Sequence, residues 1–328
     1  MGITPPYRIH GLDALRGIAA LGVFCFHLNV IFPGTAAWSG KGYLAVDFFM
    51  MLSGYVMGRT YEARMASGLG ITAFVALRHR RLWLTMALGG LIGIPYLWHV
   101  TGDPLVFAFA FALNLALLPG SVRHELFPLN NPGWSIFYEL VANALHAAFL
   151  WRLGHRGLIA LIMALLLPMT YFAQLKGDLN FGELTQQAGP ALVRCLTSYA
   201  IGLLLWRWWR DRPVITIPPV LALIALPTLL LSPWAGLGWG FDLAFVLVAS
   251  PLLIAGGLGL RANPRWTVWA GAVSFPLYAV HMATFRTAYL AGIGPVPAAI
   301  FALAAALTMA WWLPGGLRHA RRHRTAAE

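Results

Sequence analysis

The 328-residue sequence is poor in charged residues and almost without lysine. Asp, Glu, Lys and Arg make up only 10% of it, while 59% is hydrophobic and the mean hydropathy is +0.70. A soluble domain carries about 25% charged residues, and a disordered chain is short of apolar residues. The composition therefore excludes both classes and indicates a membrane protein.

The sequence also lacks the alternation of apolar and polar residues that marks a transmembrane β-barrel. Long apolar runs recur instead to the end of the chain. We therefore predict an all-α fold, a polytopic bundle of transmembrane helices. Eleven apolar segments can be drawn: 12–32, 42–60, 82–99, 104–119, 134–151, 157–174, 190–209, 214–231, 238–260, 268–290 and 297–315.

The arginines predict how these segments cross the membrane. The formal net charge is +12, yet Lys41 and Lys176 are the only lysines, and arginines cluster at the segment ends. The positive-inside rule puts all clusters in the cytoplasm if either 104–119 or 134–151 does not cross. The segment 104–119 is short and bounded by prolines, so we expect it to be re-entrant or lateral.

This reading gives about ten spanning helices, with both termini in the cytoplasm. Because topology accounts for the positive charge, we expect no nucleic-acid partner.

Cysteine is scarce as well. Cys25 and Cys195 lie in apolar segments, so no structural disulfide is expected. Residues 1–32 superficially resemble a signal peptide, but the apolar stretch is long, carries ionisable residues and lacks a clear cleavage site. We interpret it as a retained first helix. Without repeats or long polar linkers, residues 1–328 are assigned to one domain.

Arg16 and His27 lie inside the first apolar segment. Eleven helical residues make three turns plus about 20°, so both side chains share one face, ~16 Å apart along the axis. An ionisable group in hydrocarbon costs at least ~2.5 kcal/mol. This face therefore points to protein, water or a ligand, and the alternative to a functional site is a buried polar contact between helices.

Two carboxylates are expected near the depth of His27. Asp47 enters at the outer start of the second segment, and Glu139 lies in a polar stripe of the helix that follows Pro132. A packing network fixed by Glu139 is the alternative. Gly54 and Gly58 are typical of close helix packing rather than of chemistry.

Later in the sequence, Ser274, Tyr278 and His281 share a helix face, and His281 reaches a depth comparable with His27. A helix–helix contact is the alternative for this histidine. Arginines also cluster between the second and third segments, where they serve as a topology signal or bind phosphates.

In this order, these elements resemble signatures of the acyltransferase-3 family of bacterial integral membrane acyltransferases, which includes enzymes that acylate O-antigens and macrolides. The first is Arg16 with His27 eleven positions later. The others are residues 42–49 with 52–55, the basic entry 78–82, Trp134-Ser135-Ile136 with Glu139, and Ser274, Tyr278 and His281. Ile136 replaces the usual Leu. A Gly-Asp-Ser element is missing, so no fused hydrolase-like domain is expected.

The resemblance implies a membrane O-acyltransferase that moves an acyl group, commonly acetyl, from acyl-CoA to a hydroxyl of a sugar, glycolipid or glycosylated small molecule. Acyl-CoA would be a donor substrate, with no tightly bound cofactor and no metal. The acceptor, the acyl chain length and the oligomeric state stay open. A secondary transporter or flippase that uses intramembrane ionisable residues is the alternative function.

His27 is interpreted as the general base on the acceptor hydroxyl, or as a transient acyl carrier. Glu139 or Asp47 would orient it. The donors to the thioester oxyanion are left open among Arg16, Trp134 and Ser135.

Further residues are expected to bind the substrates. For the CoA phosphates these are Arg78, Arg80 and Arg81, with Arg59 or Arg16; around the acyl group and acceptor they are Ser53, Trp134, Ser135, Tyr138, Tyr278 and His281. We expect one continuous passage to join the arginines to the pocket of His27.

Overall fold

The computed structural model describes residues 8–231, 236–260, 262 and 264–313. In this part of the chain the regular structure is helical, apart from isolated β-bridges that join Val122 to Glu125 and Glu125 to Leu184. The α-helices are α1 (His10–Ile31), α2 (Ala45–Ala66), α3 (Ile71–Ile92), α4 (Ile94–Thr101), α5 (Pro104–Leu115), α6 (Gly133–Ala148), α7 (His155–Lys176), α8 (Ala188–Trp209), α9 (Pro219–Leu231), α10 (Trp239–Ala244), α11 (Ser250–Leu258), α12 (Arg265–Leu290) and α13 (Pro295–Trp312). Short turns of helix are η1 (Ala37–Ser39), η2 (Gly42–Leu44), η3 (Leu150–Arg152), η4 (Thr185–Gln187) and the π-helical η6 (Phe245–Ala249).

The helical bundle predicted from the sequence is confirmed, and each of the eleven apolar segments coincides with one helix or with two or three consecutive ones. The segment 82–99 spans the end of α3 and α4, which meet at a bend of 61°. The segment 238–260 comprises α10, η6 and α11, which run on without a break. The chain is therefore an integral membrane protein with many apolar helices.

The number of crossings follows less directly from the helices. Within the described residues, six helices are long and apolar enough to span a membrane, or seven if α3 and α4 count as one bent span. The helix α2 has 22 residues but carries Asp47, Arg59, Glu62 and Arg64, and α5, α6 and α9 are shorter than the roughly 20 residues of a full span. The count of ten spans thus stays a prediction.

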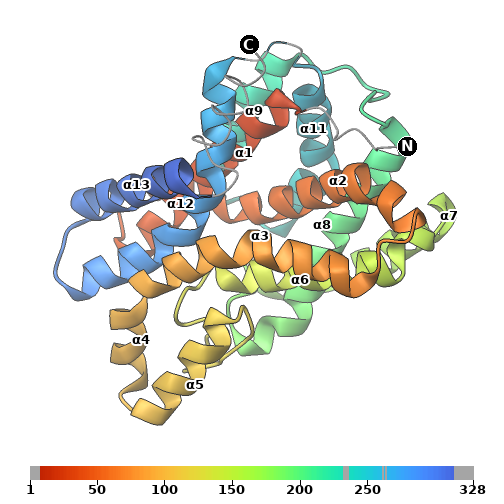
Figure 1. Ribbon diagram of the computed structural model, residues 1–328. Coiled ribbons are helices and arrows are strands. Elements are labelled where there is room, and N and C mark those ends of the chain that lie inside the picture. Colours follow the sequence, from red (N-terminus) through yellow and green to blue (C-terminus); the bar gives the residue numbers. More distant parts are fainter. Residues whose placement is uncertain (1–7, 232–235, 261, 263, 314–328) are drawn as a thin grey trace, which may run out of the picture.

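The pair α4 and α5 extends away from the main bundle (Figure 1). The helix α5 covers only part of the segment 104–119, because the chain leaves the helix after Leu115 and Leu117 adopts a positive φ. A short helix beside a bent one is the geometry expected of a lateral or re-entrant piece. Whether it crosses the membrane stays open.

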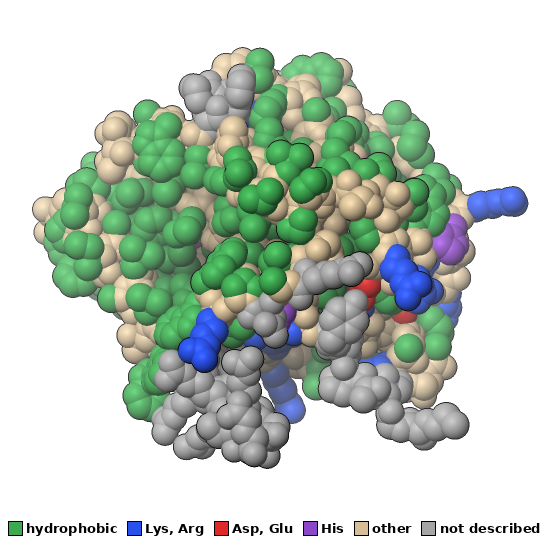
Figure 2. Space-filling model, turned by 90° about the horizontal axis from the view of Figure 1, so that it is seen from above, with side chains coloured by type: hydrophobic (Ala, Val, Ile, Leu, Met, Phe, Trp, Pro, Cys, Tyr) green, Lys and Arg blue, Asp and Glu red, His purple; other side chains and the backbone are tan. Residues whose placement is uncertain are grey.

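The outer surface suits a lipid environment. Hydrophobic side chains cover most of the face seen in Figure 2, and on α7 Leu167 and Leu175 are 74% and 68% exposed. Such contiguous apolar surface is rare on soluble monomers. The sequence predicts basic clusters after the segments 238–260 and 297–315. Arg261 in the first cluster and residues 318–324 in the second lie outside the described residues.

Two helix pairs form the frame of the bundle, α1 with α12 and α2 with α8. The backbones of α2 and α8 approach so closely that a Cβ on Gly54 would lie 2.0 Å from the Tyr199 carbonyl oxygen, and one on Gly202 would lie 1.9 Å from that of Met51. The packing role predicted for Gly54 is thus confirmed. Buried ion pairs join the same helices, Asp47 with Arg194 toward one end and Glu62 with Arg207 toward the other.

Candidate functional site

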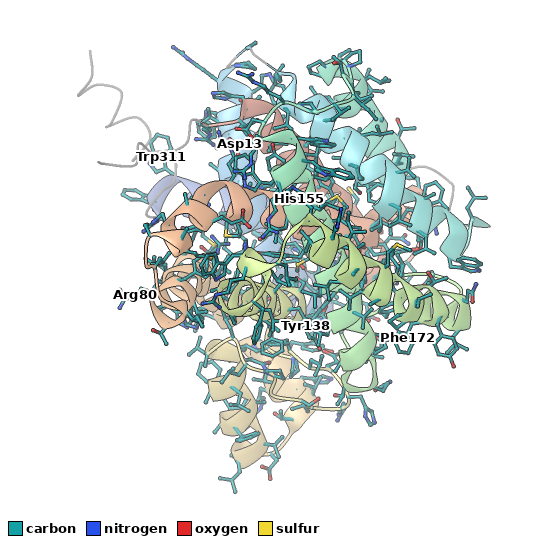
Figure 3. All side chains as sticks on the ribbon, turned by 90° about the vertical axis from the view of Figure 1, so that its right-hand side faces the viewer. Asp13, Arg80, Tyr138, His155, Phe172 and Trp311 are labelled. Atoms are coloured by element: carbon teal, nitrogen blue, oxygen red, sulfur yellow. The ribbon has the colours of Figure 1, made fainter. Side chains whose placement is uncertain are left out.

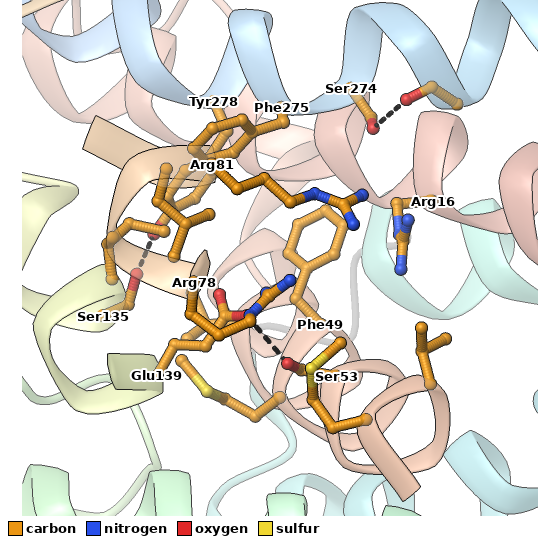
Figure 4. Close-up of a pocket in the computed structure, with 17 residues that line it drawn as sticks. Arg16, Phe49, Ser53, Arg78, Arg81, Ser135, Glu139, Ser274, Phe275 and Tyr278 are labelled. Carbon is orange, nitrogen blue, oxygen red and sulfur yellow. Dashed lines mark hydrogen bonds and ion pairs between the residues drawn. The ribbon is translucent and has the colours of Figure 1, made fainter. Parts of the chain in front are cut away.

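Five helices, α1, α2, α3, α6 and α12, enclose a cavity that we call the arginine cavity (Figure 4). The space between these side chains amounts to about 880 Å³, part of it open to the outside. Its polar lining comprises Arg16, Ser53, Arg78, Arg81, Ser135, Glu139, Ser274 and Tyr278. The structure therefore brings together side chains that the sequence placed on separate helices.

Arg78 and Glu139 form the centre of this cavity. The Arg78 Nη2 donates to Glu139 Oε1 at 2.8 Å, and the Ser53 hydroxyl donates to the same oxygen at 2.8 Å. Arg78 is 4% exposed, and its Nε and Nη1 are buried without a hydrogen-bond partner. Since an unpaired buried donor is costly, these two groups are poised for an oxygen ligand.

The charge of the cavity is positive. Arg16, Arg78 and Arg81 contribute three guanidinium groups, and Glu139 is the one carboxylate in the lining. Arg16 comes from α1 and Arg81 from α3, and both reach into the cavity in Figure 4. A cavity with more guanidinium than carboxylate groups favours an anionic ligand.

His27 lines a second cavity, which we call the histidine cavity. It encloses about 600 Å³, part of it open to the outside. Its lining combines apolar and aromatic side chains with a few polar groups, as small-molecule sites do. These polar or aromatic residues are Phe26, His27, Tyr43, Trp134, Asn180, Phe181, Glu183, Arg194 and Tyr278.

The partner of His27 is a second histidine. The His27 Nδ1 lies 2.7 Å from His281 Nε2, and the rings stack with centroids 4.9 Å apart. The His281 Nδ1 lies 3.0 Å from the Leu277 carbonyl oxygen, which only accepts hydrogen bonds. His281 Nδ1 therefore carries a proton, and in the neutral ring its Nε2 accepts from His27 Nδ1. This leaves a lone pair on His27 Nε2, the atom a general base uses.

The expected carboxylate partners of His27 are engaged elsewhere, which corrects the prediction that Glu139 or Asp47 orients this ring. Glu139 is held by Arg78 and Ser53. Asp47 is 1% exposed and accepts from Arg194 Nε on both oxygens at 3.0 Å and from its Nη2 at 2.6 Å. In this buried ion pair, two nitrogens of Arg194 donate to the Asp47 carboxylate, so the pair links α2 to α8 and has a structural role.

The single continuous passage predicted from the sequence stays a prediction. Two adjoining cavities are found, and Val46 and Tyr278 line both of them. Ser135 donates its hydroxyl proton to the Pro132 carbonyl oxygen at 3.1 Å, so the 2.6 Å contact between the hydroxyls of Ser135 and Tyr278 is donated by Tyr278. This bond holds the Tyr278 ring between the two cavities.

Four predicted substrate-binding residues lie outside both linings, Arg59, Arg80, Tyr138 and His281. Arg59 pairs with Asp211 at 2.7 Å. Arg80 is exposed and lies at the edge of the molecule (Figure 3), because it is turned away from the cavity face that Arg78 and Arg81 share on α3. The Tyr138 hydroxyl donates to the Ala188 carbonyl oxygen at 2.9 Å and joins α6 to α8.

The other predicted residues divide between the cavities. Trp134 lines the histidine cavity, while Ser53, Ser135 and Ser274 line the arginine cavity. His281 is fully buried behind His27 and lines neither. The sequence predicted that His281 reaches the depth of His27, and the contact between the two rings confirms this.

Sequence reasoning missed Arg194, Asn180 and Glu183. An arginine within the apolar segment 190–209 was a usable signal, since such a charge requires a buried partner. Asn180 and Glu183 lie in the connection between α7 and η4, where no periodicity indicates their orientation. Only the fold brings them to the histidine cavity.

A family model described as an acyltransferase domain matches residues 9–314, nearly the whole chain. Protein 2 in the picA locus of Rhizobium radiobacter is 36% identical over 167 residues, which cover 45% of this chain and 85% of that protein.

Two further relatives carry names that state a reaction. The putative membrane-bound transacylase BcsY of Komagataeibacter xylinus is 30% identical over 215 residues, 62% of this chain and 52% of that protein. The O-acetyltransferase OatA of Staphylococcus aureus is 40% identical over 52 residues, 16% of this chain and 8% of that protein. The chain thus spans about half the length of the second relative and a small part of the third. No solved structure matches it.

Proposed function

The chain belongs to the acyltransferase-3 family of membrane acyltransferases, and from this premise we propose that it transfers an acyl group from acyl-CoA to a hydroxyl of a sugar, glycolipid or glycosylated small molecule. Acetyl is the simplest acyl group for this role, as the name of the O-acetyltransferase relative also suggests. We place the protein in the inner membrane with both termini in the cytoplasm, where the positive-inside rule puts its arginines. The arginine cavity then opens toward the compartment that holds acyl-CoA.

The observation that carries the proposal is the buried guanidinium of Arg78. Two of its nitrogens are unpartnered and lie in a cavity with two more arginines. The phosphates of CoA are multiply charged anions, and guanidinium groups bind phosphate oxygens in a forked geometry. We assign phosphate binding to Arg16, Arg78 and Arg81, and we withdraw Arg59 and Arg80 from that role.

His27 acts in this proposal as the general base. Its Nε2 takes the proton of the acceptor hydroxyl while the hydroxyl oxygen attacks the thioester carbonyl carbon. The new C–O bond forms, the C–S bond breaks, and the CoA thiolate leaves and takes the proton from the imidazolium. His281 accepts from His27 Nδ1 throughout and so keeps Nε2 turned to the acceptor.

The thioester has to meet the acceptor where the two cavities touch. Val46 and Tyr278 form that boundary, so we propose that the acyl end of the donor reaches Tyr278 from the arginine cavity. No donor to the oxyanion is assigned, because the Ser135 hydroxyl gives its proton to the Pro132 carbonyl oxygen and Arg78 is assigned to phosphate.

The first test replaces the proposed base. Purified His27→Ala should lose acyl transfer by about 10²-fold or more, the usual contribution of a general base, while acetyl-CoA still raises its melting temperature as in wild type. Transfer is measured as CoA release and as radiolabelled acetyl incorporated by membrane vesicles that contain the protein. Wild-type transfer rates in His27→Ala would remove the base assignment.

A further inference from the structure

We propose that the histidine cavity is the acceptor site and that Asn180 and Glu183 form its entrance for a neutral, hydroxyl-bearing ligand such as a sugar. This rests on the proposed function and adds which cavity takes which substrate. In the lining, Val30, Asn180 and Glu183 are the exposed residues, so the cavity opens beside them.

The two cavities lie at different heights along the bundle axis. On α1, Arg16 lines the arginine cavity and His27 the histidine cavity, ~16 Å further along the axis. On α12 the same order appears, with Gly271 in the first cavity and Met282 in the second. The two substrates can therefore approach the shared boundary at Tyr278 from different heights.

The charges separate the ligands of the two cavities. Arg194 is the cation that lines the histidine cavity, and its charge is already neutralised by Asp47 at 2.6 Å. The carboxylate of Glu183 stands exposed at the entrance and accepts from Asn131 Nδ2 at 3.1 Å. A carboxylate at the mouth and no spare cation in the described lining disfavour a phosphate or carboxylate ligand.

The remaining groups suit a hydroxylated ligand. The amide of Asn180 both donates and accepts, and the carboxylate of Glu183 accepts strongly from hydroxyls. Phe26, Trp134 and Phe181 supply apolar surface between this entrance and His27. A sugar offers both hydroxyls and apolar C–H faces, and a hydroxyl inside the cavity would meet the lone pair of His27 Nε2.

The test blocks the entrance with a removable group. Asn180→Cys is treated with a methanethiosulfonate reagent in vesicles that contain the full chain. The matched control is Gln186→Cys, at an exposed residue of the adjoining η4 outside both linings. Treated wild type controls for Cys25 and Cys195. We expect modified Asn180→Cys to lose at least about ten-fold of acetyl incorporation, to bind acetyl-CoA unchanged by thermal shift, and to recover on reduction, while modified Gln186→Cys keeps both properties.

Three results would overturn the inference. Undiminished incorporation by modified Asn180→Cys would show that the acceptor enters elsewhere, and loss of acetyl-CoA binding in this variant would assign the cavity to the donor. Mass spectrometry of the labelled product should find a neutral hydroxyl compound, and a product that is predominantly anionic contradicts the charge argument. Failure of the proposed function looks different, because wild type itself would then neither incorporate acetyl nor respond to acetyl-CoA.

Discussion

At the scale of single residues, the tautomer of His27 depends on a hydrogen-bond acceptor, His281, that lies far away in the sequence. The Leu277 carbonyl fixes the proton of His281, and His281 in turn fixes that of His27. In many enzymes a carboxylate orients the catalytic histidine. Here a neutral ring takes that place and adds no negative charge next to His27.

This arrangement makes His281 a positioning residue. We predict that His281→Ala lowers kcat by about ten-fold or more, yet by less than the loss of His27 itself, and leaves the KM for acetyl-CoA unchanged. His281→Gln keeps a side-chain oxygen that can accept from His27 Nδ1, and it should recover part of the rate. Steady-state kinetics of both variants checks this, and equal rates for wild type and His281→Ala would leave the histidine contact without a catalytic role.

Residue types in the sequence indicated several members of the site, but their partners could not be predicted. Helical spacing correctly put Arg16 and His27 on one protein-facing stripe, since both line cavities. Whether Asp47 meets His27 or Arg194 depends on how α2 and α8 pack, and no local pattern contains that information. Arg78 and Arg80 look alike in the sequence, and only the rotation of α3 separates a buried side chain that lines a cavity from an exposed one.

At the scale of helices, the contact of α2 with α8 determines where Ser53 and Asp47 lie. Ser53 directly precedes Gly54, the residue through which the two backbones touch. The same helix delivers Ser53 to Glu139 and Val46 to the boundary between the cavities. The arginine cavity therefore relies on a contact that only a residue without Cβ permits.

Gly54→Ala should consequently destabilise the folded protein. The added Cβ would overlap the Tyr199 carbonyl oxygen and force the helices apart, at a cost of about 1–3 kcal/mol. Gly189→Ala at the start of α8 has no atom within 4 Å of the added Cβ and serves as the control. Thermal unfolding in detergent should show a lower melting temperature for Gly54→Ala alone, and equal values for the two variants would contradict the packing account.

The hydrophobicity of the sequence predicted where the helices lie, because burial in lipid or protein demands long apolar runs. It did not predict where the helices end or bend. The bend between α3 and α4 occurs at Gly93, where a Cβ would lie 1.8 Å from the Leu129 carbonyl oxygen. This contact with a distant loop is invisible in the local sequence.

At the scale of the whole molecule, two cavities of different charge meet inside a bundle with an apolar exterior. A cationic cavity on one side of Tyr278 and a cavity with a carboxylate entrance on the other would keep an anionic donor and a neutral acceptor apart until they meet. The sequence predicted residues of both cavities and a passage that joins them, and that passage stays a prediction. The boundary arises from the Tyr278 ring held by Ser135, a contact between α6 and α12.

The most direct test of donor binding in the arginine cavity measures, by thermal shift, how donor analogues bind to purified wild type and Arg81→Ala. Acetyl-CoA and desulfo-CoA, which keep the phosphates, should raise the melting temperature of wild type, and pantetheine, which lacks them, should not. Arg81→Ala should need about ten-fold more acetyl-CoA for the same shift, because one charged hydrogen-bond donor is lost. A melting temperature indifferent to all three compounds would contradict the account and favour a transport function, and equal shifts with pantetheine and acetyl-CoA would contradict phosphate binding by the arginine cavity.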